Sequence, residues 1–419
     1  MINKKLNLFL ILFILLIVAF LGSSIYFLFF TKCPYKIGTN IMDWIKQPCP
    51  YVISGVIIDQ ISDQAVIDAT VSFPKGKILS SNQGEFVLET RGELNKIIIN
   101  KDGYYTKEVE ISVSEENPTI NLGKIFLLPE GRILYQKGGS IFSSNFDGSE
   151  SKKLTDGELV AIAPIYDKFV FKTPDSALRL MDIQGNNQIK FAYQSSQPDR
   201  PTFTTFSLNG NILAWIASYE VEGPQGKRKD EEVIYFNFEL EKQSSVSQIF
   251  RNIYNFRISP DGKYIAVVGI SYDGSHLVHL EDIVRRKILL QIKNPEKYFF
   301  DEENFYYSVP GSGWYIYHLQ DGKTDSFNLE PSWWENKFVG IINPYTKKDI
   351  AILRPGWSIR LADINGLNVK RLVDLEPPSG YVKNLRWSSN KNYLLFEISQ
   401  PYSLYVLDIN SNKYKKIDF

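Results

Sequence analysis

Residues 255–269 read NFRISPDGKYIAVVG, and this stretch decides the fold. Residues 256–258 alternate between apolar and polar side chains, and a second apolar run follows from 264 to 268. Between the two runs, Pro260 presets φ for a turn and Gly262 accepts a positive φ. The stretch therefore predicts a β-hairpin with a short polar tip.

Weaker copies of this hairpin recur through the last two-thirds of the chain, and each is followed by a further strand that often ends in Asp. The copies lie at 165–171, 206–215, 300–307, 343–352 and 385–396, and the strands at 140–145, 177–182, 233–237, 314–317, 358–363 and 403–408. Equating Ile133, Phe169, Ile212, Ile265, Phe305, Ile350 and Leu394 gives spacings of 36, 43, 53, 40, 45 and 44 residues. Four short strands in about 40–45 residues is the period of a β-propeller blade, so seven units predict a seven-bladed propeller.

The phrase SPDGKYIAVVG at 259–269, together with the strand pattern L-Y-x-x-D at 404–408, resembles the TolB-like and WD40-like propeller repeats. Similar repeats occur in the propellers of prolyl-oligopeptidase-type peptidases. The resemblance covers about residues 130–419 and implies an architecture. It implies almost nothing about activity, because propellers host binding, scaffolding and enzymatic functions.

A smaller β-domain is predicted at 51–129, where short alternating strands at 52–59, 65–73, 85–89, 96–100 and 104–113 favour a β-sandwich. The segment resembles the carboxypeptidase regulatory-like domain, a transthyretin-type sandwich, through Ser54-Gly55-Val56 with Asp59, Ala69-Thr70-Val71, Gly84-Glu85-Phe86 and Gly103-Tyr104. The resemblance implies a spacer or adhesion module without peptidase activity. Residues 124–128 fit either the last sandwich strand or the missing inner strand of the first blade.

Residues 6–30 form an almost unbroken apolar run after Lys4 and Lys5. As a helix this run would span roughly 37 Å, which is enough to cross a membrane. It predicts one uncleaved transmembrane helix between a cytoplasmic tail at 1–5 and a juxtamembrane segment at 31–50. The alternative is a cleaved signal peptide, because small residues at 22–24 resemble a cleavage site.

Cys33 and Cys49 are the two cysteines of the chain, and they flank one short segment just after the predicted span. In an oxidising compartment they could form a disulfide that closes a loop of about 16 residues. The alternative is two unpaired thiols. We expect the C-terminal domains to be extracytoplasmic, in the cell envelope.

Motifs for catalysis and cofactors are absent from the sequence. There is no G-x-S-x-G nucleophile elbow, phosphate loop or dinucleotide fingerprint, so we predict no catalytic residue and no cofactor. His276 and His279 are three apart on a predicted strand, so they point to opposite faces and cannot share a metal. The chain holds 47 basic and 47 acidic residues, which gives no field to attract nucleic acid.

Aromatic side chains in predicted connections are the candidate partner-binding residues: Trp333, Trp334 and Trp357. The alternative, which these positions favour, is packing between neighbouring blades. The charged segment 226–232 is predicted to be a hairpin insertion, either solvated or in contact with a partner. We expect a membrane-anchored, non-catalytic binding or scaffold protein that recognises a protein or an envelope polymer. The alternatives are a cell-envelope hydrolase with carboxylates in the propeller channel and a structural subunit of an envelope complex.

Overall fold

The computed structural model describes residues 50–91, 94–113, 118–165, 167–175, 177–186, 188–191, 203–223, 226–327, 340–354, 358–364, 366–374, 382–399 and 402–418. Within these ranges the chain is all-β, and no helix is long and apolar enough to cross a membrane. The predicted anchor at 6–30 lies outside them. The chain divides into two compact units, one ending at Leu127 and the other made of Gln60–Asp63 and Leu128–Phe419.

The first unit is a sandwich of two sheets. One sheet has the order β4-β1-β7, in which β1 (Tyr51–Asp59) pairs antiparallel with β4 (Glu85–Thr90) and parallel with β7 (Thr119–Leu127). The other has the order β3-β2-β5-β6 and comprises β2 (Thr70–Phe73), β3 (Gly76–Leu79), β5 (Lys96–Asn100) and β6 (Lys107–Glu110). Side chains from both sheets share one buried core that includes Ile53, Phe86, Val71 and Ile97, as expected for a β-sandwich.

The structure resolves the ambiguity at 124–128 and corrects two predicted strands. Residues 124–127 belong to β7, so this segment is the last strand of the sandwich. The strand predicted at 65–73 begins only at Thr70, because Asp68 has a φ of 53° that interrupts an extended backbone. The strand predicted at 104–113 is confined to Lys107–Glu110.

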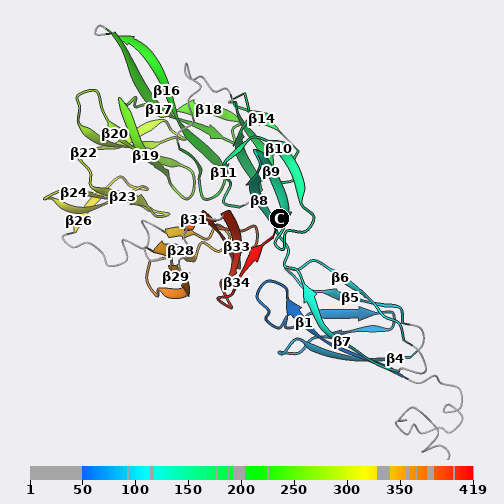
Figure 1. Cartoon of the computed structure of the whole chain (residues 1–419). Helices are drawn as coiled ribbons and strands as arrows, with labels where there is room; N and C mark the ends of the chain where they lie inside the picture. Colours follow the sequence, from blue (N-terminus) through cyan, green and yellow to red (C-terminus); the bar gives the residue numbers. More distant parts are fainter. Residues whose placement is uncertain are drawn as a thin grey trace, which may run out of the picture. The chain divides into compact units, whose positions relative to one another are not determined.

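The described residues of the second unit form seven sheets, numbered I to VII in chain order, and together these make a β-propeller. In Figure 1 the sheets follow one another round a closed path, so that sheet VII (red) lies beside sheet I (teal). Sheet I contains β8 (Arg132–Lys137), β9 (Ser140–Asn145) and β10 (Lys152–Asp156), and sheet II contains β11 (Glu158–Ile162), β12 (Lys168–Lys172), β13 (Leu178–Asp182) and β14 (Ile189–Lys190). Sheet III contains β15 (Thr204–Phe206), β16 (Ile212–Gly223), β17 (Gly226–Asn237) and β18 (Lys242–Ser245). Sheet IV contains β19 (Asn252–Ile258), β20 (Tyr264–Ile270), β21 (His276–Asp282) and β22 (Lys287–Lys293).

The remaining three sheets repeat the same up-and-down order. Sheet V contains β23 (Lys297–Phe300), β24 (Asn304–Val309), β25 (Gly313–His318) and β26 (Thr324–Phe327). Sheet VI contains β27 (Gly340–Ile342), β28 (Asp349–Arg354), β29 (Ser358–Asp363) and β30 (Lys370–Asp374). Sheet VII contains β31 (Val382–Trp387), β32 (Tyr393–Ser399), β33 (Tyr402–Asp408) and β34 (Tyr414–Ile417). Every pairing within a sheet joins strands that are consecutive in the chain.

The repeat positions identified in the sequence occupy equivalent places in the sheets. They fall on β8, β12, β16, β20, β24, β28 and β32, and all seven side chains are at most 1% exposed. In sheets II to VII these are the second strands. Strand β8 therefore corresponds to a second strand, and sheet I has no counterpart of the first strand among the described residues.

The hairpin predicted at 255–269 is confirmed, and its tip is held by local hydrogen bonds. Strands β19 and β20 pair antiparallel, with Ile258 opposite Ile265. The Ser259 hydroxyl donates to Asp261 Oδ1 at 2.7 Å, and that oxygen also accepts the Lys263 N–H at 3.1 Å. Gly262 has a φ of +75°, which allows the chain to reverse without strain.

We expect Gly262→Ala to lower the free energy of unfolding by about 2–3 kcal/mol, measured by urea denaturation. The added Cβ would lie 3.0 Å from Ile212 Cγ1 and 3.3 Å from Asn209 Oδ1, on a backbone that L residues rarely adopt. Gly274→Ala is the matched control, because Gly274 has a φ of +81° but nothing within 4 Å of its added Cβ. It should cost only about 1 kcal/mol. Equal losses in the two variants would contradict the role of crowding.

Candidate functional site

The first strands of several sheets meet around a cavity of about 370 Å³ at the centre of the propeller. Its wall is built from β15, β19, β23 and β27, with the turn after β11 contributing Pro164. First strands of neighbouring sheets contact one another, as β11 does with β15 and β19 with β23. The cavity is therefore axial, and it lies in the size range of small-ligand sites.

The wall of this axial cavity is mostly apolar, with a few polar groups. Phe206, Phe256, Ile258, Phe300 and Ile341 supply the apolar surface. Three side chains with polar ends, Thr205, Asn255 and Arg257, complete it. Among the described lining residues Arg257 carries the only charge, and none is Asp or Glu. The carboxylate pair required by the hydrolase alternative is thus not found in this part of the wall.

Strand β19 positions the polar groups. Asn255 and Arg257 are two residues apart on one strand and therefore point to the same face. Phe256 lies between them and is 1% exposed in the core of sheets III and IV. The guanidinium carbon of Arg257 lies 5.9 Å from the centre of the Tyr298 ring on β23.

Burial controls the ionisation of this pair. Desolvation lowers the pKa of Arg257, and the neighbouring Tyr298 phenol opposes that shift. Desolvation also raises the pKa of Tyr298 to about 12. An arginine stays charged at every physiological pH, so the cavity wall presents a fixed, half-buried cation.

The turns between first and second strands define one end of the cavity. Asn209 Nδ2 donates to the Asp261 carbonyl at 2.7 Å, which ties sheet III to sheet IV. Asn343 Nδ2 donates to the Lys391 carbonyl at 3.2 Å in the same way between sheets VI and VII. The Tyr345 hydroxyl donates to the carbonyl of Ile165 at 3.0 Å, so sheet VI also reaches sheet II. These bonds hold the turns at this end of the cavity in place. Pro260, in the turn between β19 and β20, lines the cavity there.

Sheets I and VII meet at a seam that no shared strand closes in the described chain. The Ser389 hydroxyl lies 2.9 Å from the Arg132 nitrogen, whose N–H it accepts, and it donates to the Arg132 carbonyl at 3.3 Å. The Arg386 guanidinium donates to the Leu134 carbonyl at 3.2 Å and to Glu397 Oε1 at 2.8 Å. Side chains of sheet VII thus satisfy the edge of β8 that a first strand would otherwise pair.

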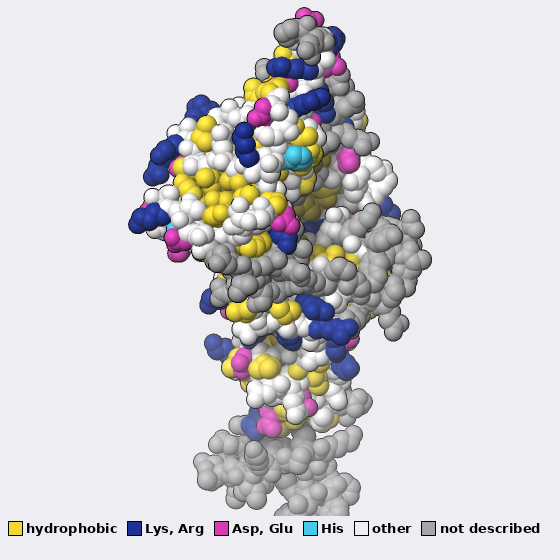
Figure 2. Space-filling model, turned by 90° about the vertical axis from the view of Figure 1, so that its left-hand side faces the viewer, with side chains coloured by type: hydrophobic (Ala, Val, Ile, Leu, Met, Phe, Trp, Pro, Cys, Tyr) yellow, Lys and Arg dark blue, Asp and Glu magenta, His cyan; other side chains and the backbone are white. Residues whose placement is uncertain are grey.

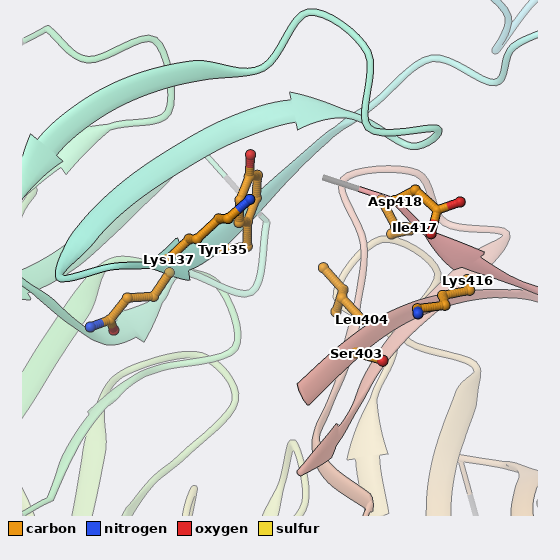
Figure 3. A pocket seen from close by; sticks show the side chains of 8 residues that line it. Tyr135, Lys137, Ser403, Leu404, Lys416, Ile417 and Asp418 are labelled. Carbon is orange, nitrogen blue, oxygen red and sulfur yellow. The ribbon is translucent and has the colours of Figure 1, made fainter. Parts of the chain in front are cut away.

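A second cavity of about 290 Å³ flanks this seam. In Figure 3, Tyr135 and Lys137 from β8 face Leu404 from β33 and Lys416 from β34 across it. The Tyr135 hydroxyl is within 2.6 Å of Ser151 Oγ. The wall carries charges of both signs, since Asp418 also lines it.

Sheet IV contains a polar cluster that the sequence did not predict. His279 and Glu281 lie on one face of β21 and are 0% and 1% exposed, with His279 Nε2 3.0 Å from Glu281 Oε2. The Ser247 hydroxyl donates to the same carboxylate oxygen, which also accepts the Ser247 N–H at 2.9 Å. Gln291 Nε2 lies 3.2 Å from the other ring nitrogen of His279.

This cluster contains Ser, His and Glu but lacks the geometry of a catalytic triad. Ser247 Oγ and Glu281 both approach Nε2 of His279, at 3.4 and 3.0 Å. A triad needs the hydroxyl on one ring nitrogen and the carboxylate on the other. Burial alone would raise the pKa of Glu281, but the hydrogen bonds from His279 and Ser247 outweigh it and hold that pKa below its usual value. The cluster is a structural element of the sheet.

His276 and His279 lie on opposite faces of their strand, as predicted. His276 is exposed and stacks on Tyr254, whereas His279 points into the core, so the two occupy opposite faces of β21. No group of three or more His, Cys, Asp or Glu side chains within the described ranges is placed to hold a metal ion. The aspartates at the ends of third strands accept turn N–H groups in the pairs Gln184–Asp182, Leu367–Asp363 and Asn410–Asp408.

The charged segment 226–232 is part of a hairpin, as predicted. Strands β16 and β17 contain 12 residues each and pair along their whole length. The hairpin reaches beyond the other strands of sheet III in Figure 1. Arg228 lies over the Tyr272 ring at 4.5 Å, and Glu231 Oε2 accepts the Ile253 N–H at 2.6 Å, so sheet IV supports its base.

Several candidate residues lie outside the described part of the chain. These are the partner-binding candidates Trp333, Trp334 and Trp357 and the cysteines Cys33 and Cys49, so their roles remain predictions. On the face of the molecule in Figure 2, basic and acidic side chains are interspersed between apolar ones. That face has no single-sign field of the kind that attracts nucleic acid.

No protein family model and no curated protein matches the chain. Among solved structures it is similar to the tricorn protease at 12% identity and a TM-score of 0.44, covering 85% of this chain but only 43% of the protease. It is similar to TolB from Acinetobacter baumannii at 13% identity and a TM-score of 0.38, covering 68% of this chain and 77% of TolB. It is also similar to the propeller domain of the Trilobed protease from Pyrococcus furiosus, at 12% identity and a TM-score of 0.39, covering 69% of this chain and 84% of that domain. These likenesses concern the fold and leave activity open.

Proposed function

We propose that this protein is a non-catalytic binding or scaffold protein whose propeller recognises a protein or an envelope polymer through its axial cavity. The observation that carries the proposal is the wall of that cavity, where aromatic and aliphatic side chains surround a few convergent polar groups. Such a wall is typical of a recognition site, because apolar surface supplies affinity and sparse polar groups supply orientation.

In this proposal the remaining parts of the chain attach the propeller to the membrane and hold it away from the surface. In this proposal the seven sheets are the blades, the sandwich is a carboxypeptidase regulatory-like spacer, and residues 6–30 are a single transmembrane anchor. The spacer and propeller then stand on the extracytoplasmic side of the cell membrane. Support for the anchor comes from the length and apolar character of the run at 6–30.

The test is capture of a partner from native envelope membranes by the full-length protein, with the partner identified by mass spectrometry. Thr205→Trp fills the axial cavity, and Thr324→Trp places the same bulk at an exposed position on the outer strand β26. We expect Thr205→Trp to lose the partner and Thr324→Trp to keep it. A partner lost instead with Trp333→Ala/Trp334→Ala would move the site to those tryptophans. Capture of nothing by the wild type would contradict a binding role.

A further inference from the structure

The hairpin of β16 and β17 has an open strand edge where it extends past the rest of sheet III (Figure 1). Strand β18 pairs with β17 over Ile234–Asn237, and further along β17 the N–H and carbonyl of Glu231 both bond to Phe250. Backbone groups of alternate residues in a strand point the same way, so those of Lys229 and Lys227 also face this edge. No described residue forms a hydrogen bond with these two N–H and two carbonyl groups.

Sheet IV holds the open edge in an extended form. The Arg228 guanidinium carbon lies 4.5 Å from the centre of the Tyr272 ring, and Glu231 at the base of the hairpin accepts the Ile253 N–H at 2.6 Å. The open stretch, residues 226–230, is about 17 Å long. Because this edge is already ordered, a strand that binds to it loses less conformational entropy in the complex.

The side chains along the open edge are basic. Lys227 and Lys229 flank the exposed Arg228, and each lysine has a carboxylate partner inside the hairpin, Glu220 at 3.4 Å and Glu231 at 2.9 Å. The two lysine side chains nevertheless remain 69% and 61% exposed, and an ammonium group has three donors. Glu220 lies on β16, across the hairpin from the open edge, and Glu231 is buried. A strand that arrives at this edge therefore meets positive charge.

We propose that the open edge of β17 binds an extended acidic segment of a partner protein as an added strand. The backbone of the segment bonds to the N–H and carbonyl groups of Lys227 and Lys229, and its alternate carboxylates approach the two ammonium groups. A second copy of this chain does not fit, because two such edges would place lysines opposite lysines. This surface is separate from the axial cavity and goes beyond the proposed function.

The probe is the peptide Gly-Ser-Glu-Thr-Glu-Thr-Glu-Ser-Gly with fluorescein at its amino terminus, and its binding to the full-length protein is followed by fluorescence anisotropy. We expect a dissociation constant below about 0.5 mM, and binding about tenfold weaker or worse when Lys replaces each Glu.

N-methylated peptides distinguish strand addition from attraction between charges. Backbone N–H groups alternate in direction along a strand, so methyl groups on the three Glu nitrogens and on the two Thr nitrogens block opposite edges of the peptide. For antiparallel addition we expect the Glu set to weaken binding about tenfold and the Thr set less than about twofold. Parallel addition exchanges the two results, because the residues opposite the lysines then direct their N–H groups away.

Variants locate the contact on β17. Lys229→Pro removes the outward N–H and leaves the bonds to β16, since proline is tolerated on an edge strand whose N–H faces solvent. It should weaken binding about tenfold, whereas Lys229→Ala, which keeps the N–H and loses the charge, should weaken it only about two- to fivefold. Lys416→Ala removes an exposed lysine of β34 and should behave as the wild type. Circular dichroism melts establish that each variant is folded, and the N-methyl comparison needs no variant.

The inference is overturned by equal binding of the Glu and Lys peptides, including no binding of either below about 0.5 mM. Equal effects of the two N-methylated sets, or binding that survives Lys229→Pro, would also overturn it. Thr205→Trp, which fills the axial cavity, should leave peptide binding unchanged. Loss of the peptide in that variant would place it in the axial cavity and contradict a separate surface, so failure of this inference is distinguishable from failure of the proposed function.

Discussion

Glu281→Ala is expected to lower the free energy of unfolding by about 3–5 kcal/mol, which is the cost of breaking a buried polar pair by removing one partner. The carboxylate is 1% exposed and is the acceptor for His279 Nε2 and for both the N–H and the hydroxyl of Ser247. Alanine leaves the buried His279 ring nitrogen without this acceptor, whereas the exposed Ser247 can bond to water instead. Chemical denaturation of the full-length protein measures the loss.

The same carboxylate should make stability depend on pH in a defined direction. Its pKa is lowered in the folded state, so its contribution is complete above the ordinary value of 4.5 and is lost as the pH falls through the lower folded-state pKa. We expect the stability difference between the wild type and Glu281→Gln to be constant at neutral pH and to shrink below pH 4.5. Glu296→Ala, at an exposed position before β23, is the control and should change stability by less than about 0.5 kcal/mol. A difference that grows on acidification would contradict the assignment.

The second large effect is expected at the seam. Arg386→Met should lower the free energy of unfolding by about 3–5 kcal/mol, because Glu397 loses its cation and the Leu134 carbonyl loses the hydrogen bond from this guanidinium. The side chains of Arg386 and Glu397 are only 17% and 13% exposed, so solvent compensates little. Guanidinium denaturation monitored by tryptophan fluorescence is the measurement, and hydrogen exchange at β8 reports the seam itself.

Two further variants distinguish the loss of the seam contacts from a general loss of positive charge. Arg285→Met removes an arginine that is 78% exposed and 3.5 Å from Asp282, and it should cost less than about 1 kcal/mol. The double variant Arg386→Met/Glu397→Leu should recover part of the loss, because no charge is left buried alone. If Arg386→Met is as harmless as Arg285→Met, side chains of sheet VII do not close the propeller.

The sequence predicted the strands of the propeller well because each strand is a local pattern. Residues such as Ile265 and Leu394 recur at one place in every unit, and their burial follows from alternation along a strand. The turn at 259–262 was predictable for the same reason, since its residues bond mainly to one another. The strand predicted at 65–69 was wrong because Asp68 adopts a left-handed conformation that the alternation of apolar residues does not reveal.

The candidate site was not predictable in the same way, because its parts come together only through the arrangement of the sheets. Arg257 was read as one polar position in an alternating strand, and nothing local indicates that β19 faces an axis shared with β15 and β27. The partners Ser247 and Glu281 are 34 residues apart, and Arg132 and Ser389 are 257 apart. A His and a Glu two residues apart on an apolar strand, as at His279 and Glu281, are a sequence signal for a buried polar cluster. No comparable signal in the sequence marks Ser389.

Within the described part of the chain no strand is shared across the seam, and this has a consequence for how the chain acquires its structure. Each sheet of the second unit is made of consecutive strands, so its backbone pairing needs only the roughly 40–45 residues of its own repeat. A nascent chain can therefore complete one sheet after another as it emerges. The last step, when Arg386 and Ser389 reach back to β8, depends on contacts of long sequence separation, as does the hydrogen bond between Tyr345 and Ile165. Closure of the ring then costs loop entropy at the end of folding, and the open arc of finished sheets is the species most exposed to misassembly.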